Sequence, residues 1–270
     1  MQDYYRISFE ELGKDSKIPI KKLKETEEVF YEIAMEMIRA IKKSAAKNKE
    51  CVMIIPVGPI GQYPIFTRFV NEQKISLEHV WFINMDEYLT ANKKWLPKED
   101  KLSFRGYMER EVYGKIEQEL LMPENQRIFP DPSDPAKIPE LFEKKDVDLC
   151  IGGLGINGHV AFNEPEDISI EDFKKQKTRI VEISQETRVV NSIGNLNGAV
   201  EAMPGFAVTI GFNEIFNAKK IRLYVFRPWH SAVIRRASYG EISSAFPVSI
   251  LQTHQDTWIT CNEIAGQRSF

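Results

Sequence analysis

The chain of 270 residues carries 36 basic and 39 acidic side chains, and its net charge of −3 leaves no basic surface for nucleic acid. Hydrophobic residues make up 43% of the sequence, which is ample for a core, and no apolar run approaches the roughly 18 residues of a membrane-spanning helix. The first residues also lack the charged and apolar regions of a signal peptide. We therefore expect a cytoplasmic protein with no nucleic acid and no membrane as a partner.

Length and cysteine content restrict the possible architectures further. Single α/β domains of about 200 to 250 residues are common, so we expect one domain over residues 1–270. The three cysteines, Cys51, Cys150 and Cys261, are an odd number, and each lies in or beside an apolar run. This placement predicts reduced core cysteines rather than disulfides.

The first part of the chain alternates between helical and extended patterns. After an arm of little pattern up to about residue 20, apolar residues recur with helical spacing from Lys21 to Lys47. Cys51–Pro56 is short and β-branched and predicts the first central strand, and Val80–Leu89 predicts a second strand. A helix is expected between them, around Phe66 to Val70. This order favours a parallel sheet covered by helices.

Glycines and carboxylates follow these two strands. Gly58 and Gly61 lie between a strand and a helix, where main-chain NH groups can cradle an anion. The loop lacks Ser, Thr and Lys, and Pro59 removes one donor, so an anion there would need donors from elsewhere. Asp86 and Glu87 alternate along an extended chain, so at most one of them points into a site. A solvated turn or a helix cap is the ordinary alternative for such a pair.

The rest of the chain continues the alternation of elements. A loop is expected at 90–101, a helix at 102–121, a proline-rich segment at 121–135 and a short helix at 139–145. Residues 166–177 are expected to form a loop or lid over the glycine-rich loop at 152–158 or, alternatively, a solvated surface helix. The remaining expected elements are strands at 178–183, 206–211, 221–226 and 257–261, and helices at 213–217 and 232–239.

A strand expected at 147–151 runs directly into a loop with glycines at 152, 153, 155 and 158. In open α/β sheets, ligands usually bind just beyond the carboxyl ends of the strands, because glycines let the backbone approach a bound group. His159 and Glu164 follow these glycines. We therefore expect a site where the polar positions at several strand ends meet: Gly58, Gly61, Asp86, Glu87, Asn157 to Glu164, and Arg188.

Two strings at these strand ends resemble the signatures of glucosamine-6-phosphate deaminases. They are Asn-Met-Asp-Glu-Tyr at 84–88 and Gly-His-Val-Ala-Phe-Asn-Glu-Pro at 158–165. The segments 187–192 and 207–211 resemble two further family segments in the same order, and the resemblance spans roughly residues 20 to 262. The fold we expect is a single Rossmann-like α/β domain. It has a mostly parallel sheet with helices on both faces and a lid over the carboxyl edge of the sheet.

The resemblance implies conversion of an amino sugar phosphate into a ketose phosphate and ammonia. The steps are ring opening, proton transfer between C2 and C1, and release of the amine. Asp86 matches the family's base, and a carboxylate can take and return a proton on one face of an enediol-type intermediate. His159 matches the ring-opening residue, and Glu164 matches the carboxylate that fixes its tautomer. A helix-capping Asp86, a structural His159 and a solvated Glu164 are the ordinary alternatives.

One catalytic position departs from the family pattern. Asn157 stands where an acidic residue usually completes an Asp-His-Glu arrangement. An asparagine can hydrogen-bond to His159, but it cannot stabilise an imidazolium by charge. Ring opening is therefore either slower or supported by Glu164 alone.

The expected phosphate site departs further. Hydroxyl donors are missing from residues 57–61, and His230 aligns with a family lysine that meets the phosphate. Arg188 matches a phosphate-contacting arginine of the family. Three other arginines can compensate if they face the loop: Arg227, Arg235 and Arg236. The expected substrate-binding positions are thus Gly58, Gly61, Glu87, Gly158, Arg188 and His230.

Three functions agree with these observations. The first is an aldose-ketose isomerase or deaminase acting on an amino sugar, with the need for a phosphate left open. The second is a sugar-phosphate lactonase, because such enzymes share this general fold and a comparable histidine loop. The third is a sugar-binding sensor or partner subunit without turnover, for which Asn157 and the altered loop argue. The joint presence of Asp86, His159 and Glu164 favours the first, because a pure binder needs neither a base nor a proton relay.

No metal and no cofactor are expected. The four histidines show no paired ligand spacing, and ring opening and proton transfer need no redox cofactor. The expected partner is a small sugar or sugar phosphate, and homo-oligomers are frequent in the family. Arg179 matches a family effector residue, but Val181 stands where a basic partner is expected, so regulation of that kind is not expected.

Overall fold

Burial on both faces of the central strands explains why a parallel sheet forms the centre of the protein. In the computed structural model, which describes residues 3–270, strand β2 (Cys51–Ile55) is buried along its whole length. Val52 and Ile54 belong to one hydrophobic core, and the three alternate residues of the strand belong to a second core. A strand buried on both faces is typical of a sheet covered by helices on both sides.

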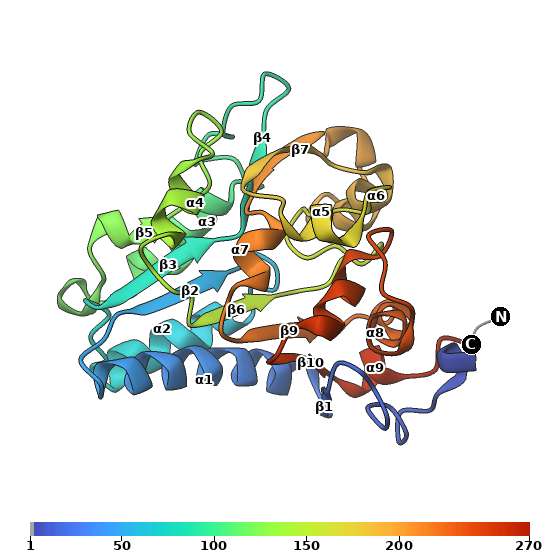
Figure 1. Cartoon of the computed structure of the whole chain (residues 1–270). Coiled ribbons are helices and arrows are strands. Elements are labelled where there is room, and N and C mark those ends of the chain that lie inside the picture. Colours follow the sequence, from blue (N-terminus) through green and yellow to red (C-terminus); the bar gives the residue numbers. More distant parts are fainter. Residues whose placement is uncertain (1–2) are drawn as a thin grey trace.

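Seven parallel strands make up this sheet (Figure 1). Their order is β1-β10-β9-β6-β2-β3-β5, and every neighbouring pair is parallel. The other six strands are β1 (Ile20–Lys22), β3 (Val80–Asn84), β5 (Arg127–Ile128), β6 (Leu149–Gly152), β9 (Ile221–Val225) and β10 (Thr257–Cys261). The predicted mostly parallel sheet is confirmed. Strand β1, at the end of the N-terminal arm, closes the edge beyond β10.

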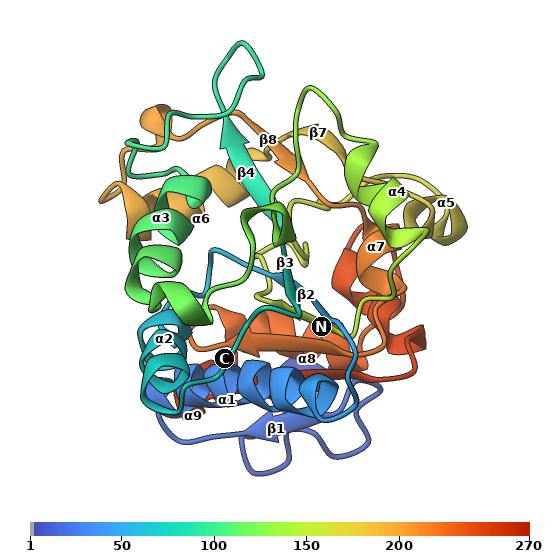
Figure 2. The ribbon, with the colours of Figure 1, turned by 90° about the vertical axis from the view of Figure 1, so that its left-hand side faces the viewer.

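Helices cover both faces of the sheet, as predicted (Figure 2). One face packs against α1 (Thr26–Ala45), α2 (Gln62–Glu72) and α3 (Phe104–Glu111). The other packs against α4 (Lys137–Phe142), α7 (Phe212–Phe216), α8 (His230–Tyr239) and α9 (Glu263–Gly266). Helix α1 begins later than the predicted Lys21, because residues 20–22 form β1 and Glu25 and Glu28 form a capping box at its start.

A second, smaller sheet lies above the parallel sheet in Figure 1. It is antiparallel, in the order β4 (Asp86–Leu89), β8 (Phe206–Thr209) and β7 (Arg179–Glu182). Helix α6 (Gln185–Asn195) follows β7 directly. Three of the predicted extended segments therefore contribute to this layer, and it provides the cover over the carboxyl edge of the parallel sheet.

The predicted single strand Val80–Leu89 is divided between the two sheets at Met85. The Met85 main-chain NH donates to Ile55 O in the first sheet, and its carbonyl accepts from Ile210 N beside the second sheet, at 3.0 and 2.8 Å. One residue thus transfers the chain from one set of main-chain partners to another. Apolar patterning could not reveal this division, because both halves are buried.

Two other segments differ from expectation. The helix predicted at 102–121 ends at Glu111 and is followed by two short 3₁₀ helices, although its later apolar residues still reach the core. The segment 166–177 contains the short helix α5 (Ile170–Lys174), whose Phe173 ring packs edge-on against Phe212 at 5.1 Å between centroids. This is closer to the alternative of a surface helix than to a lid.

Two simple expectations can be compared with the fold. All three cysteines are free and buried, so their prediction as core residues is confirmed. Among the described residues, no helix combines the length and the apolar character that crossing a membrane requires.

Candidate active site

The candidate site is a cavity of about 510 Å³ at the carboxyl ends of the central strands. The chain beyond β2 and the chain beyond β6 both line it, and successive elements leave these two neighbouring strands in opposite directions across the sheet. Crevices at such a topological switch point are where α/β sheets usually bind ligands. The segments after β3 and β9, the start of α3 and one side of α6 complete the walls.

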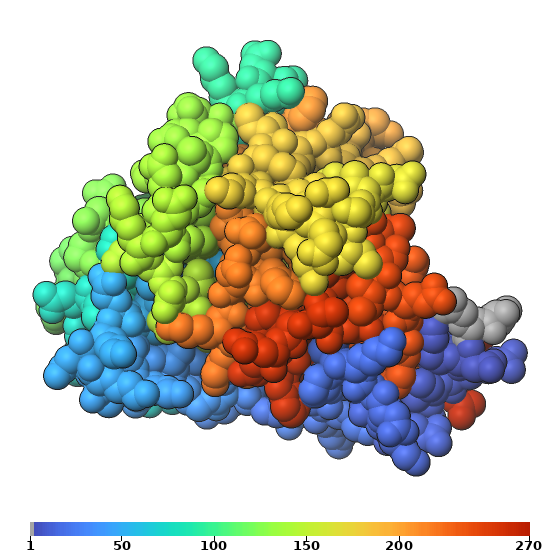
Figure 3. All heavy atoms as spheres, in the orientation of Figure 1, coloured from blue at the N-terminus to red at the C-terminus, as the bar shows by residue number. Residues whose placement is uncertain are grey.

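Residues 166–168 are hydrogen-bonded to the C-terminal part of the chain, on the face shown in Figure 3. The Ser244 hydroxyl donates to Ile168 O at 2.7 Å, and Glu166 N donates to Ser244 O at 3.2 Å. Residues 166–177 line no part of the cavity. Helix α6 lines it instead and forms its cover.

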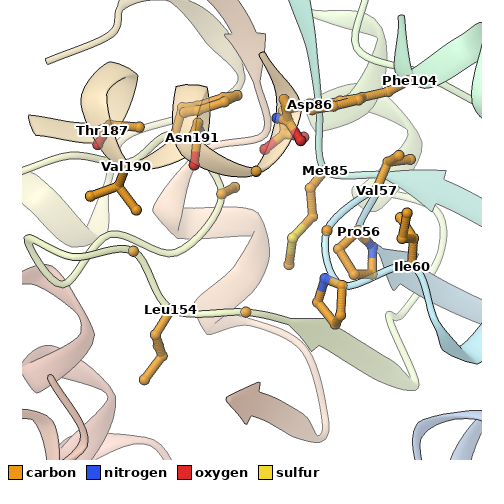
Figure 4. Close-up of a pocket in the computed structure, with 18 of the residues that line it drawn as sticks. Pro56, Val57, Ile60, Met85, Asp86, Phe104, Leu154, Thr187, Val190 and Asn191 are labelled. Carbon is orange, nitrogen blue, oxygen red and sulfur yellow. The ribbon is translucent and has the colours of Figure 1, made fainter. Parts of the chain in front are cut away.

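Asp86 lies in the wall of the cavity at the first position of β4 (Figure 4). Its side chain is 8% exposed, and its carboxylate has no hydrogen-bond partner among the described residues. Burial, and to a smaller extent the neighbouring Glu87 charge, raises the pKa of Asp86 to about 8. A carboxyl group with a raised pKa and no protein partner is well suited to exchange a proton with a ligand.

Glu87 points to the opposite side of β4, as the alternation of strand side chains requires. It is fully buried and accepts hydrogen bonds from the Ser103 hydroxyl and from the NH groups of Phe104 and Arg105, at the start of α3. Burial raises the pKa of Glu87, and these donors oppose that shift. Glu87 therefore holds α3 in place and does not line the cavity, which disagrees with its prediction as a substrate-binding residue.

His159 lines the cavity from the glycine-rich loop. Its Nδ1 lies 2.8 Å from Asn157 Oδ1, and because an amide oxygen only accepts, Nδ1 carries the proton. The Nε2 atom is then an acceptor and has no partner among the described residues. A side chain at position 155 would place Cβ within 2.1 Å of the imidazole, so glycine is required there.

Glu164 and Asn157 hold His159 in different ways. Glu164 Oε1 lies 3.7 Å from His159 Nδ1 and has no hydrogen-bond partner, while Glu164 Oε2 accepts from Ser184 N at 2.8 Å. Burial lowers the pKa of His159, and the Glu164 charge opposes this shift. Asn157 thus selects the neutral tautomer, and Glu164 supplies a carboxylate close enough to stabilise a transient imidazolium.

Helix α6 contributes two residues that sequence analysis did not select. Ser184, its N-cap, accepts a hydrogen bond from Asn157 Nδ2 at 3.3 Å, and the Thr187 hydroxyl lies 3.3 Å from His159 Nδ1. Thr187 stands with Val190 and Asn191 on the side of the helix that faces the cavity (Figure 4). The Ser-x-x-Thr spacing at a helix start was the available signal, but without the fold it indicates only a cap.

Of the three glycines predicted to bind substrate, one lines the cavity and two do not. Gly58 lines the cavity with φ of +145°, a value that L side chains rarely adopt. Gly61 and Gly158 do not line it. Gly61 is the N-cap of α2 and packs against the Phe30 ring, and Gly158 packs against the Phe246 ring. Their main role is to permit close packing behind the walls.

His230 lines the cavity, but both of its ring nitrogens are occupied. Nδ1 accepts from Arg227 N at 3.0 Å, and Nε2 lies 3.1 Å from Leu154 O, so Nε2 is the donor. Burial lowers the pKa of His230 to about 3. His230 is therefore neutral and cannot replace the charge of a lysine, although it fixes the glycine-rich loop to the start of α8.

The arginines are placed differently from the prediction. The Arg188 guanidinium points away from the cavity to the carbonyl oxygens of Val200 and Met203, at 3.4 and 3.3 Å. Arg235 is fully buried and bonded to main-chain carbonyls, and Arg236 stacks on an aromatic ring. Of these four arginines, Arg227 alone lines the cavity. The predicted phosphate contact of Arg188 thus does not agree with the structure.

Within residues 3–270, no group of three or more His, Cys, Asp or Glu side chains is arranged to hold a metal ion. Asp86 and His159 line the cavity and can exchange protons with a ligand there. Both groups are partly withdrawn from water, and both have an atom free to meet a ligand.

Comparison with known sequences relates this chain to a group of enzymes. The chain is 30% identical over 224 residues to a glucosamine-6-phosphate deaminase of Haemophilus influenzae, covering 80% of this chain and 78% of that protein. It is 29% identical over 243 residues to the deaminase of the same name from Mycoplasma mycoides, covering 88% and 93% of the two chains. No protein-family model matches the chain.

Solved structures share the fold. A monomeric glucosamine-6-phosphate deaminase superposes with a TM-score of 0.77 at 24% identity, covering 91% of this chain and 98% of that chain. A 6-phosphogluconolactonase from Leishmania guyanensis superposes with a TM-score of 0.66 at 15% identity, covering 92% and 97%. At these identities, the structural matches concern the arrangement of the elements and not the reaction.

Proposed function

The chain belongs to the glucosamine-6-phosphate deaminase family, and we propose that it converts an amino sugar, glucosamine 6-phosphate or a related sugar, to a ketose with release of ammonia. The observation that carries this proposal is that Asp86 and His159 line one cavity, each with an atom that no described residue engages. An aldose-ketose conversion needs these two groups, a base for carbon and a proton carrier for the ring oxygen.

His159 opens the ring in the proposed reaction. Its neutral Nε2 takes the proton of the C1 hydroxyl and returns it to the ring oxygen as the C1–O5 bond breaks, so the aldehyde forms with no net change in protons. The imidazolium that exists between these transfers lies beside the free oxygen of Glu164. Asn157 keeps the proton on Nδ1 throughout, so Nε2 is again the proton acceptor at the start of each cycle.

Asp86 carries the second step. As a carboxylate it removes the proton from C2 while the substrate ammonium group passes a proton to O1, and the resulting enolamine is protonated at C1 by the same carboxyl group to give an iminium at C2. Water then adds to the imine carbon at C2, and ammonia leaves, so one amino sugar and one water yield one ketose and one ammonia. The pKa of about 8 means that Asp86 is mostly protonated in the free protein at pH 7. A substrate ammonium group nearby favours the carboxylate form.

Sugar-phosphate lactone hydrolysis is the second candidate function. The 6-phosphogluconolactonases with this fold support it. Hydrolysis of a lactone requires no base for a carbon-bound proton, so the buried and unpartnered Asp86 favours the deaminase reaction.

The remaining proposals concern the cellular location of the protein, its domain organisation and its oligomeric state. We propose a cytoplasmic location, for which three free buried cysteines argue, because disulfides are rare in reducing compartments. A single domain over residues 1–270 and a homo-oligomeric state stay predictions. The main-chain bonds of Met85 to both sheets support the first of these.

The test is to measure ammonia and ketose together from glucosamine 6-phosphate and from unphosphorylated glucosamine, with 6-phosphogluconolactone as a third substrate. We expect ammonia and ketose in equal amounts from an amino sugar and no lactone hydrolysis above the uncatalysed rate. Lactone hydrolysis without ammonia release from either amino sugar would replace this proposal by the second candidate. Ligand-induced thermal stabilisation without consumption of any sugar would indicate a sensor.

A further inference from the structure

The cavity is lined by one carboxyl group and by two cationic side chains, Lys101 and Arg227. Asp86, the carboxyl group, has a pKa of about 8, so it carries little negative charge at neutral pH. His230 is neutral, and burial lowers the pKa of His159. Two cationic side chains thus line the cavity beside a single carboxyl group, which favours a substrate with an acidic group.

Arg227 is the cation with the more specific position. It lies between β9 and α8, and its guanidinium makes no hydrogen bond and no ion pair with another described residue. By contrast, Arg179, Arg188 and Arg235 all donate to side-chain or main-chain acceptors. The nearest aromatic contact of Arg227 is the Phe226 ring, 5.8 Å from the guanidinium carbon.

The surroundings of Arg227 strengthen its interaction with an anion. Arg227 is an exposed residue, yet partial desolvation by neighbouring protein atoms lowers its pKa. It remains charged, because guanidinium groups keep their proton at any physiological pH. Charge pairs near low-dielectric protein walls are stronger than pairs in bulk water. Phe30, Phe226 and Trp229 provide such walls in this cavity.

The guanidinium also reaches the cover of the cavity. A Cβ atom on Gly194 of α6 would lie 3.7 and 3.9 Å from its two terminal nitrogens, Nη2 and Nη1. Arg227 thus extends from the floor at β9 to the helix above, and a bound anion would be held between these two layers. The first turn of the adjoining α8 carries no acidic residue that would compete for the guanidinium.

We propose that Arg227 binds the acidic group of the substrate, a phosphate or carboxylate remote from C1 and C2, and so sets a preference for an acidic over a neutral amino sugar. This inference rests on the proposed function. It assigns to Arg227 the contact that neither Arg188 nor His230 can make, and the planar guanidinium suits bidentate contact with either anion.

The first experiment replaces the guanidinium. In Arg227→Gln, we expect KM for glucosamine 6-phosphate to rise about 10- to 100-fold with kcat within about threefold of wild type, since a charge-assisted contact is lost. KM for unphosphorylated glucosamine is expected to stay within about twofold. Arg227→Lys is expected to recover part of the loss. An amino sugar with a C6 carboxylate, assayed in parallel, distinguishes the two acidic groups.

Matched variants separate this role from general effects of charge. Arg68→Gln removes an exposed arginine of α2 that pairs with Glu72 outside the cavity, and it is expected to leave both KM values unchanged. Gly194→Glu would place a carboxylate beside the Arg227 guanidinium, whereas Gly194→Gln has nearly the same shape without the charge. We expect the Glu variant to have a KM for the phosphorylated sugar about tenfold higher than the Gln variant.

A binding measurement keeps the two proposals separable. We expect inorganic phosphate to raise the melting temperature of wild-type protein and to do so much less for Arg227→Gln. Loss of this stabilisation in a protein that consumes no sugar would support the role of Arg227 and refute the proposed function. Sugar turnover with the same ratio of KM values in wild type and Arg227→Gln would overturn the role of Arg227 and leave the function standing.

Discussion

The two ends of the cavity are built differently. At the catalytic end, His159 is held by Asn157 from its own loop and lies within reach of Glu164 and Thr187. At the other end, the anion contact depends on Arg227, which has no hydrogen bond or ion pair with another described residue. We therefore expect the type of reaction to be protected by several linked contacts and the choice of substrate to depend on one side chain.

This difference has a physical cause. The proposed catalytic groups Asp86 and His159 lie just beyond the ends of β3 and β6, and main-chain hydrogen bonds of the sheets fix where those strands end. The guanidinium of Arg227 is at the end of a long side chain in a solvent-accessible position. Its place is therefore set by few contacts, and point substitutions there can change substrate preference without disturbing the fold.

The largest expected effect is at the catalytic end, from Asp86→Asn. An amide cannot act as the base, so we expect kcat to fall about 10²- to 10⁴-fold. Sugar binding should survive, because Asn fills the same space and Asp86 makes no hydrogen bond to another described residue. The measurements are initial rates of ammonia release and thermal stabilisation by the substrate. Full activity of this variant would remove Asp86 from the mechanism.

A smaller effect is expected from Asn157→Asp, which places a second carboxylate next to His159 Nδ1. An adjacent negative charge favours the imidazolium, so the pKa of His159 should rise by about 1 to 3 units and the pH profile of kcat should change. NMR titration of His159 and pH-dependent rates measure this. Asn195→Asp, on the part of α6 that lines the cavity, is the control for charge at a distance. An unchanged His159 titration would show that Asn157 acts only as a spacer.

The smallest expected effect concerns the free energy of unfolding rather than the rate. It tests whether burial of the Asp86 carboxyl group destabilises the folded protein. The pKa of Asp86 is about 8 in the folded protein, against an ordinary value of 3.8 for an aspartate side chain. Between these values the folded state keeps a proton that the unfolded state has lost, so stability falls as pH rises through this window. Asp86→Asn lacks this dependence, and its stability relative to wild type should increase by about 1 to 4 kcal/mol from pH 5 to pH 8.

Urea unfolding of both proteins at several pH values measures this difference. Asp167→Asn, at an exposed position, serves as the matched control and should follow wild type. A constant difference between wild type and Asp86→Asn across this range would mean that Asp86 is not a buried acid with a raised pKa.

Sequence patterns were sufficient for the central part of the fold. The β-branched run at 51–55 and the apolar runs near 149–152 and 221–225 became neighbouring strands, and the predicted helix around Phe66 to Val70 became α2. Patterns failed where one apolar run served two sheets, as at Met85. They also failed at residues 102–121, where apolar residues reach the core without continuous helix.

The amino-acid sequence by itself determined which loops carry the candidate chemistry. Parallel strands end at the same edge of a sheet, so Asp86 after one strand and His159 after another had to lie near one cavity. Only the tertiary structure decided which way the other side chains point. Glu87 accepts hydrogen bonds from the start of α3, and Arg188 donates to two carbonyl oxygens, in each case with partners at least twelve residues away. Arg227 lines the cavity, and its guanidinium has no hydrogen-bond partner among the described residues.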